Sequence, residues 1–97
     1  MNPEEVEDHN RKQAAMLILD VRLELDQTQP EFAEHFGLGD RHERNVEHGD
    51  ANTSLDVFLR VLARAKPEKV LRMHRHLRDL PFRQLAHLFA LTLPLFA

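Results

Sequence analysis

Helix start and stop signals lie so close together in the middle of this chain that they leave room only for short helices. Thr28 and Glu31 have the spacing of a capping box, in which each side chain accepts a hydrogen bond from the backbone N–H of the other residue. Pro30 falls in the first turn of the helix that this box opens, where a missing N–H costs nothing. Gly37 can end that helix in a left-handed conformation. The spacing therefore predicts a short helix between Thr28 and Gly37, with Phe32, Ala33 and Phe36 as its apolar face.

Two more short helices are expected directly after this one. Asp40 and Glu43 have the spacing of a second capping box, which predicts a helix over residues 40–48. Thr53 or Ser54 can cap the next helix. In that helix apolar residues recur at i, i+3, i+4 and i+7, which indicates one buried face formed by Leu55, Phe58, Leu59 and Leu62.

Longer helices are expected on both sides of this middle segment. The first runs from about residue 10 to residue 26 and carries two apolar stripes. Arg22 lies in line with Ala14, Ile18 and Leu25, and the second stripe consists of Met16, Leu19 and Leu23. After the middle segment, Pro67 suits the first turn of another helix, and a last helix is possible from residue 81 to about residue 93. No run alternates apolar and polar residues as a strand does, so the predicted class is all-α.

The composition limits both the compartment and the chemistry. The 97 residues include no cysteine, which excludes a disulfide framework and a thiolate metal site. The chain begins with acidic residues rather than a basic start and an apolar run, so we expect no secretory signal. The most apolar stretch, residues 81–97, is too short and interrupted to span a membrane. We therefore expect a soluble, cytoplasmic protein.

The sequence predicts neither metal binding nor catalysis. Seven histidines are present, but His74 and His76 point in different directions on a helix. No nucleophile–base pair, Gly-rich phosphate loop or pair of carboxylates stands out in the sequence. We expect no metal, no cofactor and no enzymatic activity.

Two short helices joined through Gly37-Leu38-Gly39, after a longer helix and before an amphipathic one, form the layout of a helix-turn-helix. Here the sequence resembles the lambda-repressor-like, or Cro/repressor (XRE), helix-turn-helix family. The resemblance covers residues 14–65 and rests on Arg22, Thr28-Gln29-Pro30-Glu31-Phe32-Ala33, Phe36-Gly37, Glu47-His48-Gly49, and Ser54-Leu55 with Leu59. It implies an all-α bundle of five helices with a C-terminal helical extension. Residues 1–13 would be an acidic arm and the start of the first helix, residues 14–65 the DNA-binding domain, and residues 66–97 the extension.

The resemblance also implies roles for single residues. Arg22 and Glu47 would form an internal salt bridge, and Gln29 would contact a DNA phosphate. The helix over residues 40–48 would lie in the major groove, with base or phosphate contacts from Arg41, His42, Arg44 and Asn45. Taken one by one, each of these side chains could equally be an ordinary exposed residue. Glu43 departs from the family pattern, which usually has an aliphatic residue at this position.

The distribution of charge opposes DNA binding. Residues 1–59 hold five basic and fourteen acidic residues, a net charge of −9, whereas residues 60–97 hold eight basic and two acidic residues, a net charge of +6. DNA affinity depends mainly on neutralising phosphates, so an acidic front half is unfavourable. Either the basic side chains of Arg60, Arg64, Lys66 and Lys69 flank the groove, or the basic back of one protomer neutralises the acidic front of another.

The sequence thus predicts a DNA-binding transcriptional regulator, in particular a repressor, that binds double-stranded DNA as a homodimer. An antitoxin that binds a cognate toxin is one alternative, and a protein-interaction module that no longer binds DNA is another. The expected dimer or partner interface consists of Leu19, Leu23, Phe82, Leu85, Leu88 and Phe89. The residues of the extension could instead fold back on the first helix.

Overall fold

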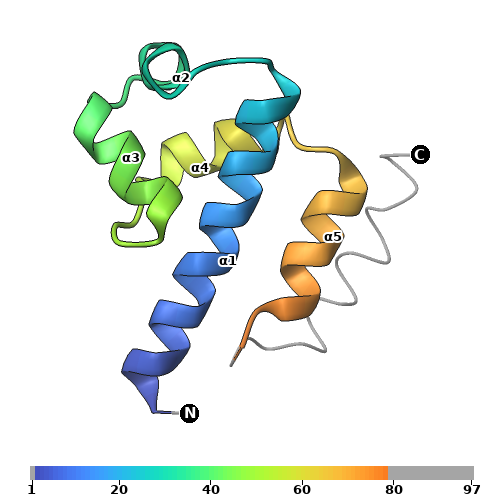
Figure 1. The fold of residues 1–97 in the computed structure, drawn as a ribbon. Coiled ribbons are helices and arrows are strands. Elements are labelled where there is room, and N and C mark those ends of the chain that lie inside the picture. Colours follow the sequence, from blue (N-terminus) through green and yellow to red (C-terminus); the bar gives the residue numbers. More distant parts are fainter. Residues whose placement is uncertain (1, 79–97) are drawn as a thin grey trace.

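Residues 2–78 are described by the computed structural model, and within them the chain forms five helices and no strand (Figure 1). The predicted all-α class is confirmed for this part of the chain. The helices are α1 (Pro3–Glu24), α2 (Gln29–Phe36), α3 (Asp40–His48), α4 (Leu55–Leu62) and α5 (Pro67–His76). The helix expected from residue 81, with Phe82, Leu85, Leu88 and Phe89, lies outside the described residues. None of the described helices is both long and apolar enough to cross a membrane.

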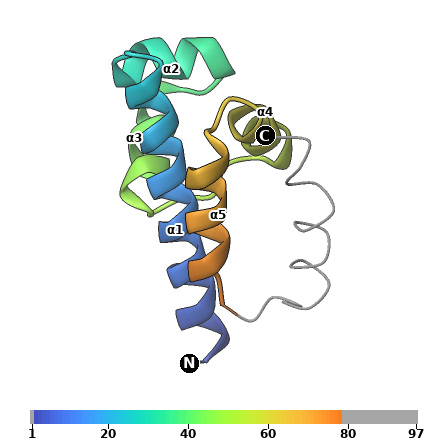
Figure 2. The ribbon, with the colours of Figure 1, turned by 90° about the vertical axis from the view of Figure 1, so that its right-hand side faces the viewer.

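The long helix α1 is the element against which the others are arranged. Helices α3 and α5 both pack against α1, and α2 packs against α3 and α4. Figure 1 shows α3 and α5 on opposite sides of α1, and Figure 2 shows that α1 and α5 run side by side. The α2–α3 pair and α5 are therefore separate attachments to the same helix.

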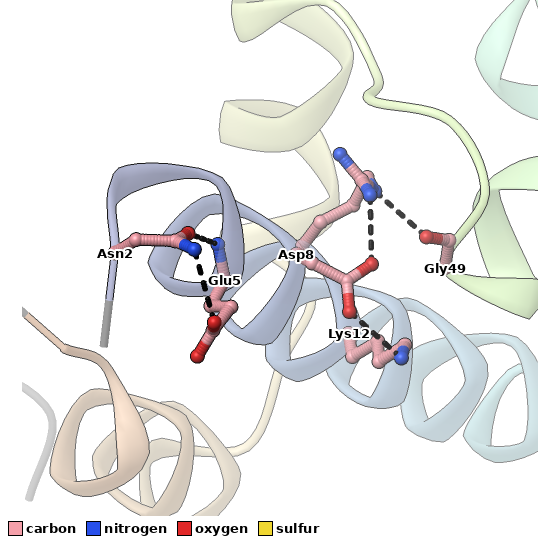
Figure 3. A network of polar contacts seen from close by, with 6 residues as sticks. Asn2, Glu5, Asp8, Lys12 and Gly49 are labelled. Carbon is pink, nitrogen blue, oxygen red and sulfur yellow. Dashed lines mark hydrogen bonds and ion pairs between the residues drawn. The ribbon is translucent and has the colours of Figure 1, made fainter.

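The start of α1 differs from the prediction. The helix begins at Pro3, because the Asn2 side chain caps it by accepting a hydrogen bond of 2.8 Å from the backbone N–H of Glu5 (Figure 3). Glu4 and Glu5 lie in the first turn, where acidic side chains interact favourably with the helix dipole. The prediction of a start near Asn10 was wrong. Residues 3–13 belong to the helix and do not form an arm.

This early part of α1 is joined to the end of α3. Arg11 Nε donates a hydrogen bond of 2.7 Å to the carbonyl oxygen of Gly49, which lies beside α1 (Figure 3). Gly49 ends α3 with a left-handed φ of 80°. A Cβ atom at this position would lie 2.9 Å from Cγ of Lys12, which is too close. Only glycine therefore satisfies both the backbone conformation and the contact with α1.

The main core is contributed by α1, α2, α3 and α4. Its buried residues are Ile18, Val21, Phe32, Phe36, Val46, Val57 and Val61. The predicted face of α4 was wrong in part: Phe58 packs against this core, but Leu55 and Leu59 are 73% and 53% exposed, and Val57 and Val61 are the buried residues. Because α4 is apolar on nearly every side, its periodicity did not determine which face would be buried.

The helix ends are set by local hydrogen bonds. At α2 the predicted capping box is confirmed, with Thr28 N donating to Glu31 Oε1 at 3.0 Å and Glu31 N donating to Thr28 Oγ1 at 3.3 Å. Ser54 caps α4. The second predicted box was wrong, because Gly39 is the N-cap of α3 and no side chain caps that helix. Glu43 does not turn back to the helix start, since it is fully buried.

The two apolar stripes of α1 have different surroundings. Ile18 is buried in the main core, and Leu25 packs against that core. In the second stripe Met16 and Leu23 are 47% and 60% exposed, and Leu19 is half-buried. Helix α5 instead covers a side of α1 where ion pairs join Arg72 to Asp20 and Lys66 to Glu24. Within residues 2–78, Met16 and Leu23 of the second stripe are therefore left exposed.

Candidate functional site

Helices α2 and α3 form a tight corner. Gly37 ends α2 with a left-handed φ of 73°, and the N–H of Leu38 donates to the carbonyl oxygen of Ala33 at 2.7 Å. Helix α3 begins only three residues after Gly37, at Asp40. Phe32 and Phe36 are buried beneath the corner, with ring centroids 4.5 Å apart. The short connection and the buried rings hold the two helices in a fixed relation to each other.

An ion pair joins this corner to α1. Arg22 Nε lies 2.8 Å from Glu47 Oε2, and the same guanidinium donates through Nη1 to the carbonyl oxygen of Gln27 at 3.0 Å. The two side chains are only 16% and 5% exposed. Burial alone would raise the pKa of Glu47, but hydrogen bonds from Glu43 and Arg22 outweigh it and lower the pKa. The structure thus brings Arg22 and Glu47 together as an ionised pair between α1 and α3.

Two arginines lie on the exposed surface of α3. Arg41 and Arg44 are exposed, and because they are three residues apart they share one side of the helix. Asn45 and His42 are half-buried, so they are less accessible than the two arginines. The sequence reasoning missed His48, which is exposed in the last turn. Its spacing of four residues from Arg44 was the signal that could have identified it.

Gln29 has a different setting from the four residues of α3. It is the first residue of α2, it is half-buried, and a hydrogen bond from its side chain helps to lower the pKa of Glu47. Its amide therefore belongs to the surroundings of the Arg22–Glu47 pair. The exposed side chains of α2 next to it include the acidic residues Glu31 and Glu34.

Glu43 occupies the inner side of α3. Its side chain is 0% exposed, and Val46 is the other buried residue of this helix. Burial, followed by the hydrogen bond and the charge of Glu47, raises the pKa of Glu43 to about 9, although Arg22 acts in the opposite direction. Glu43 is thus a buried acid on the inner side of α3.

Of the four basic residues expected to flank the corner, Arg60 is the one in direct contact with it. Its Nη2 donates to the carbonyl oxygen of Phe36 at 3.0 Å, and its guanidinium carbon lies 5.8 Å from the centre of the Phe36 ring. Lys66 pairs with Glu24 of α1 at 3.1 Å. Arg64 is exposed and Lys69 is half-buried.

The remaining predicted features are only partly described. In the expected interface Leu23 is exposed and Leu19 is half-buried, and the other four residues lie outside the described part of the chain. Among residues 2–78 no group of three or more histidine or acidic side chains is arranged to hold a metal ion.

Comparisons with known proteins found no match. No protein-family model matches the chain, and no curated protein or solved structure is significantly similar to it. We therefore infer function from the residues and their geometry.

Proposed function

We propose that this chain is a sequence-specific DNA-binding regulator of transcription, in particular a repressor, in which the α2–α3 corner acts as a helix-turn-helix. One observation carries the proposal. Arg41 and Arg44 are exposed on one side of α3, while the ion pair between Arg22 and Glu47 attaches the same helix to α1. A short helix with exposed arginines that is attached to the rest of the protein through its inner side is suited to the major groove.

In this proposal the side chains of α3 read base edges. Arg41 and Arg44 would each donate two hydrogen bonds to O6 and N7 of a guanine, and Asn45 would pair with an adenine. His42, which is half-buried, would reach a base or a phosphate only near the edge of the contact. Gln29, at the start of α2, would lie at the phosphate backbone.

We further propose that the protein acts as a homodimer. Met16 and Leu23 are exposed on α1, and a second copy is the partner that we assign to this stripe. A twofold dimer would place two α3 helices in successive major grooves, about 34 Å apart. Arg60, next to the end of α2, would supply positive charge near the phosphates.

The acidic surface of the corner favours one alternative. Glu31, Glu34 and Asp40 are all exposed on the α2–α3 corner that carries the arginines, and each would repel phosphate. The same corner could therefore bind a basic surface of another protein instead of DNA.

Selection from a pool of random double-stranded DNA at two ionic strengths separates these functions. We expect enrichment of a sequence with two related half-sites, and an affinity for it that falls as salt rises, because phosphate contacts release counterions. A pool that shows no enrichment at either ionic strength would contradict DNA reading and favour the interaction module.

A further inference from the structure

The most unusual residue of the described structure is Glu43. Its side chain belongs to the small group that is completely buried, together with Phe32, Leu17, Ile18, Val21 and Val61. All other members of that group are apolar. An ionised carboxylate in such surroundings is strongly unfavourable unless it is paired and hydrogen-bonded.

The hydrogen bonds around Glu43 do not stabilise an ionised carboxylate at this position. Neither of its two carboxyl oxygens accepts a hydrogen bond. The guanidinium of Arg22 is committed to Glu47 and to the carbonyl oxygen of Gln27. The carboxylate of Glu47 lies one turn further along α3, and its negative charge contributes to raising the pKa of Glu43. Two carboxyl groups can form a hydrogen bond only when one of them carries a proton.

The proton is assigned to Glu43 by the position of Arg22. Because the guanidinium lies 2.8 Å from Glu47 Oε2, it keeps Glu47 ionised, and the proton is left to Glu43, whose two carboxyl oxygens have no hydrogen-bond partner. The groups that face Glu43 are Glu47 on α3 and Arg22 on α1, while α2 contributes the neutral amide of Gln29 next to Glu47. With one proton these groups carry no net charge, and without it they carry one negative charge in a site that excludes water.

We propose that Glu43 is a proton-binding site that couples the docking of α3 to pH. With the proton bound, the acid donates to Glu47 and α3 packs against α1 and α2. Without the proton, a second carboxylate has to be buried beside Glu47, so α3 separates from the core. The raised pKa of Glu43, about 9 against an ordinary 4.5, agrees with this geometry.

The sign of the pH effect follows from the two states. Between the ordinary and the raised pKa, Glu43 is ionised in the unfolded chain and protonated in the folded one, so unfolding releases one proton. The contribution of Glu43 to stability is fully present below pH 4.5 and is lost as the pH rises through the raised pKa. In this window the unfolding equilibrium constant should increase about tenfold per pH unit because of Glu43 alone.

Urea unfolding of the full chain at a series of pH values, from about 5 to about 9, tests the proposal. The comparison is between the wild type and Glu43→Gln, whose amide can still donate a hydrogen bond to Glu47 but cannot titrate. The seven histidines are present in both proteins, so their titration cancels in the difference. Glu34→Gln, at an exposed position of α2, is the matched control. We expect the ratio of the unfolding constants, wild type over Glu43→Gln, to rise about tenfold per pH unit, and the ratio for Glu34→Gln to stay constant. A constant ratio for both variants would overturn the proposal.

A second measurement is made on the wild-type protein. The carboxyl carbon of Glu43 can be followed by NMR in the wild-type protein labelled with ¹³C-glutamate, with Glu43→Gln serving only to assign the signal, or Glu43→Asp if the amide does not fold. We expect the signal of a protonated acid at neutral pH. A signal that titrates near the ordinary pKa of 4.5 would overturn the proposal.

The consequence for DNA rests on the proposed function. Arg41 and Arg44 are exposed on the same helix that Glu43 anchors, so the proton would also fix their position. Both measurements report on the protein without DNA. A failure to bind DNA would therefore contradict the proposed function but not the proton site. A constant ratio of unfolding constants would contradict the proton site but not the proposed function.

Discussion

The α2–α3 corner and α5 both pack against α1, but interactions of different kinds hold them there. At the corner, the side chains of Arg22 and Glu47 are 16% and 5% exposed. At α5, those of Arg72 and Asp20 are 37% and 24% exposed, and those of the second pair, between Lys66 and Glu24, are 52% and 47% exposed. Water and salt screen the second group of ion pairs far more than the first.

The corner and α5 also differ in their apolar contacts. The corner contributes Phe32, Phe36 and Val46 to the main core. The buried residues of α5 are Met73 and His74, which are not part of that cluster. The corner thus contributes residues to the main core, whereas the buried residues of α5 lie outside it. A surface that reads another molecule needs the first kind of support, because its side chains must keep their positions.

The largest expected effect comes from breaking the ion pair of the corner. Arg22→Ala removes the partner of Glu47 and leaves that carboxylate buried beside Glu43, which should lower the free energy of unfolding by about 3–5 kcal/mol. Chemical denaturation measures this loss. Arg72→Ala is the matched control from α5, and equal losses for the two variants would contradict the distinction between the two regions.

An intermediate effect is expected at the start of α2. Thr28→Ala removes one half of the capping box and should lower the free energy of unfolding by about 1 kcal/mol. Thr53→Ala is the control, since the Thr53 hydroxyl donates to the carbonyl oxygen of Ser54 and caps no backbone N–H. If thermal unfolding shows the same loss for both threonines, the capping box does not define the corner.

The smallest effect is expected at α5. Arg72→Ala should lower the free energy of unfolding by about 0.2–1 kcal/mol, because the pair with Asp20 is partly exposed. This loss should shrink as salt is added, whereas the loss for Arg22→Ala should persist. Chemical denaturation at low and at high salt measures the loss in the free energy of unfolding for both variants. A salt-independent loss at Arg72 would place its ion pair in the same class as that of the corner.

Local features of the fold could be predicted from the sequence. The capping box of Thr28 and Glu31 and the left-handed conformation of Gly37 depend on residues close in the chain. Their physical cause is therefore visible in a few letters of sequence. The start of α1 was missed although Asn2 and Pro3 carry the same kind of signal.

Features that depend on distant residues could not be predicted in this way. The spacing of Asp40 and Glu43 fits a capping box, yet burial against α1 and α2 makes Glu43 a core residue. Its burial requires Glu47 and, from another helix, Arg22, and no local pattern contains that information. In the candidate site the sequence predicted Arg41 and Arg44, which are exposed, but it did not show that His42 and Asn45 are half-buried.

Binding of the selected DNA by Arg44→Ala, compared with Arg75→Ala, tests most directly whether α3 reads DNA. Both arginines are exposed and both substitutions remove one positive charge, so the change in net charge is the same for the two variants. We predict that Arg44→Ala weakens specific binding by about 1–3 kcal/mol and relaxes the preference at one base pair, whereas Arg75→Ala leaves the preference unchanged. Equal losses for the two variants, with the sequence preference intact in both, would contradict the assignment of α3 as the reading helix.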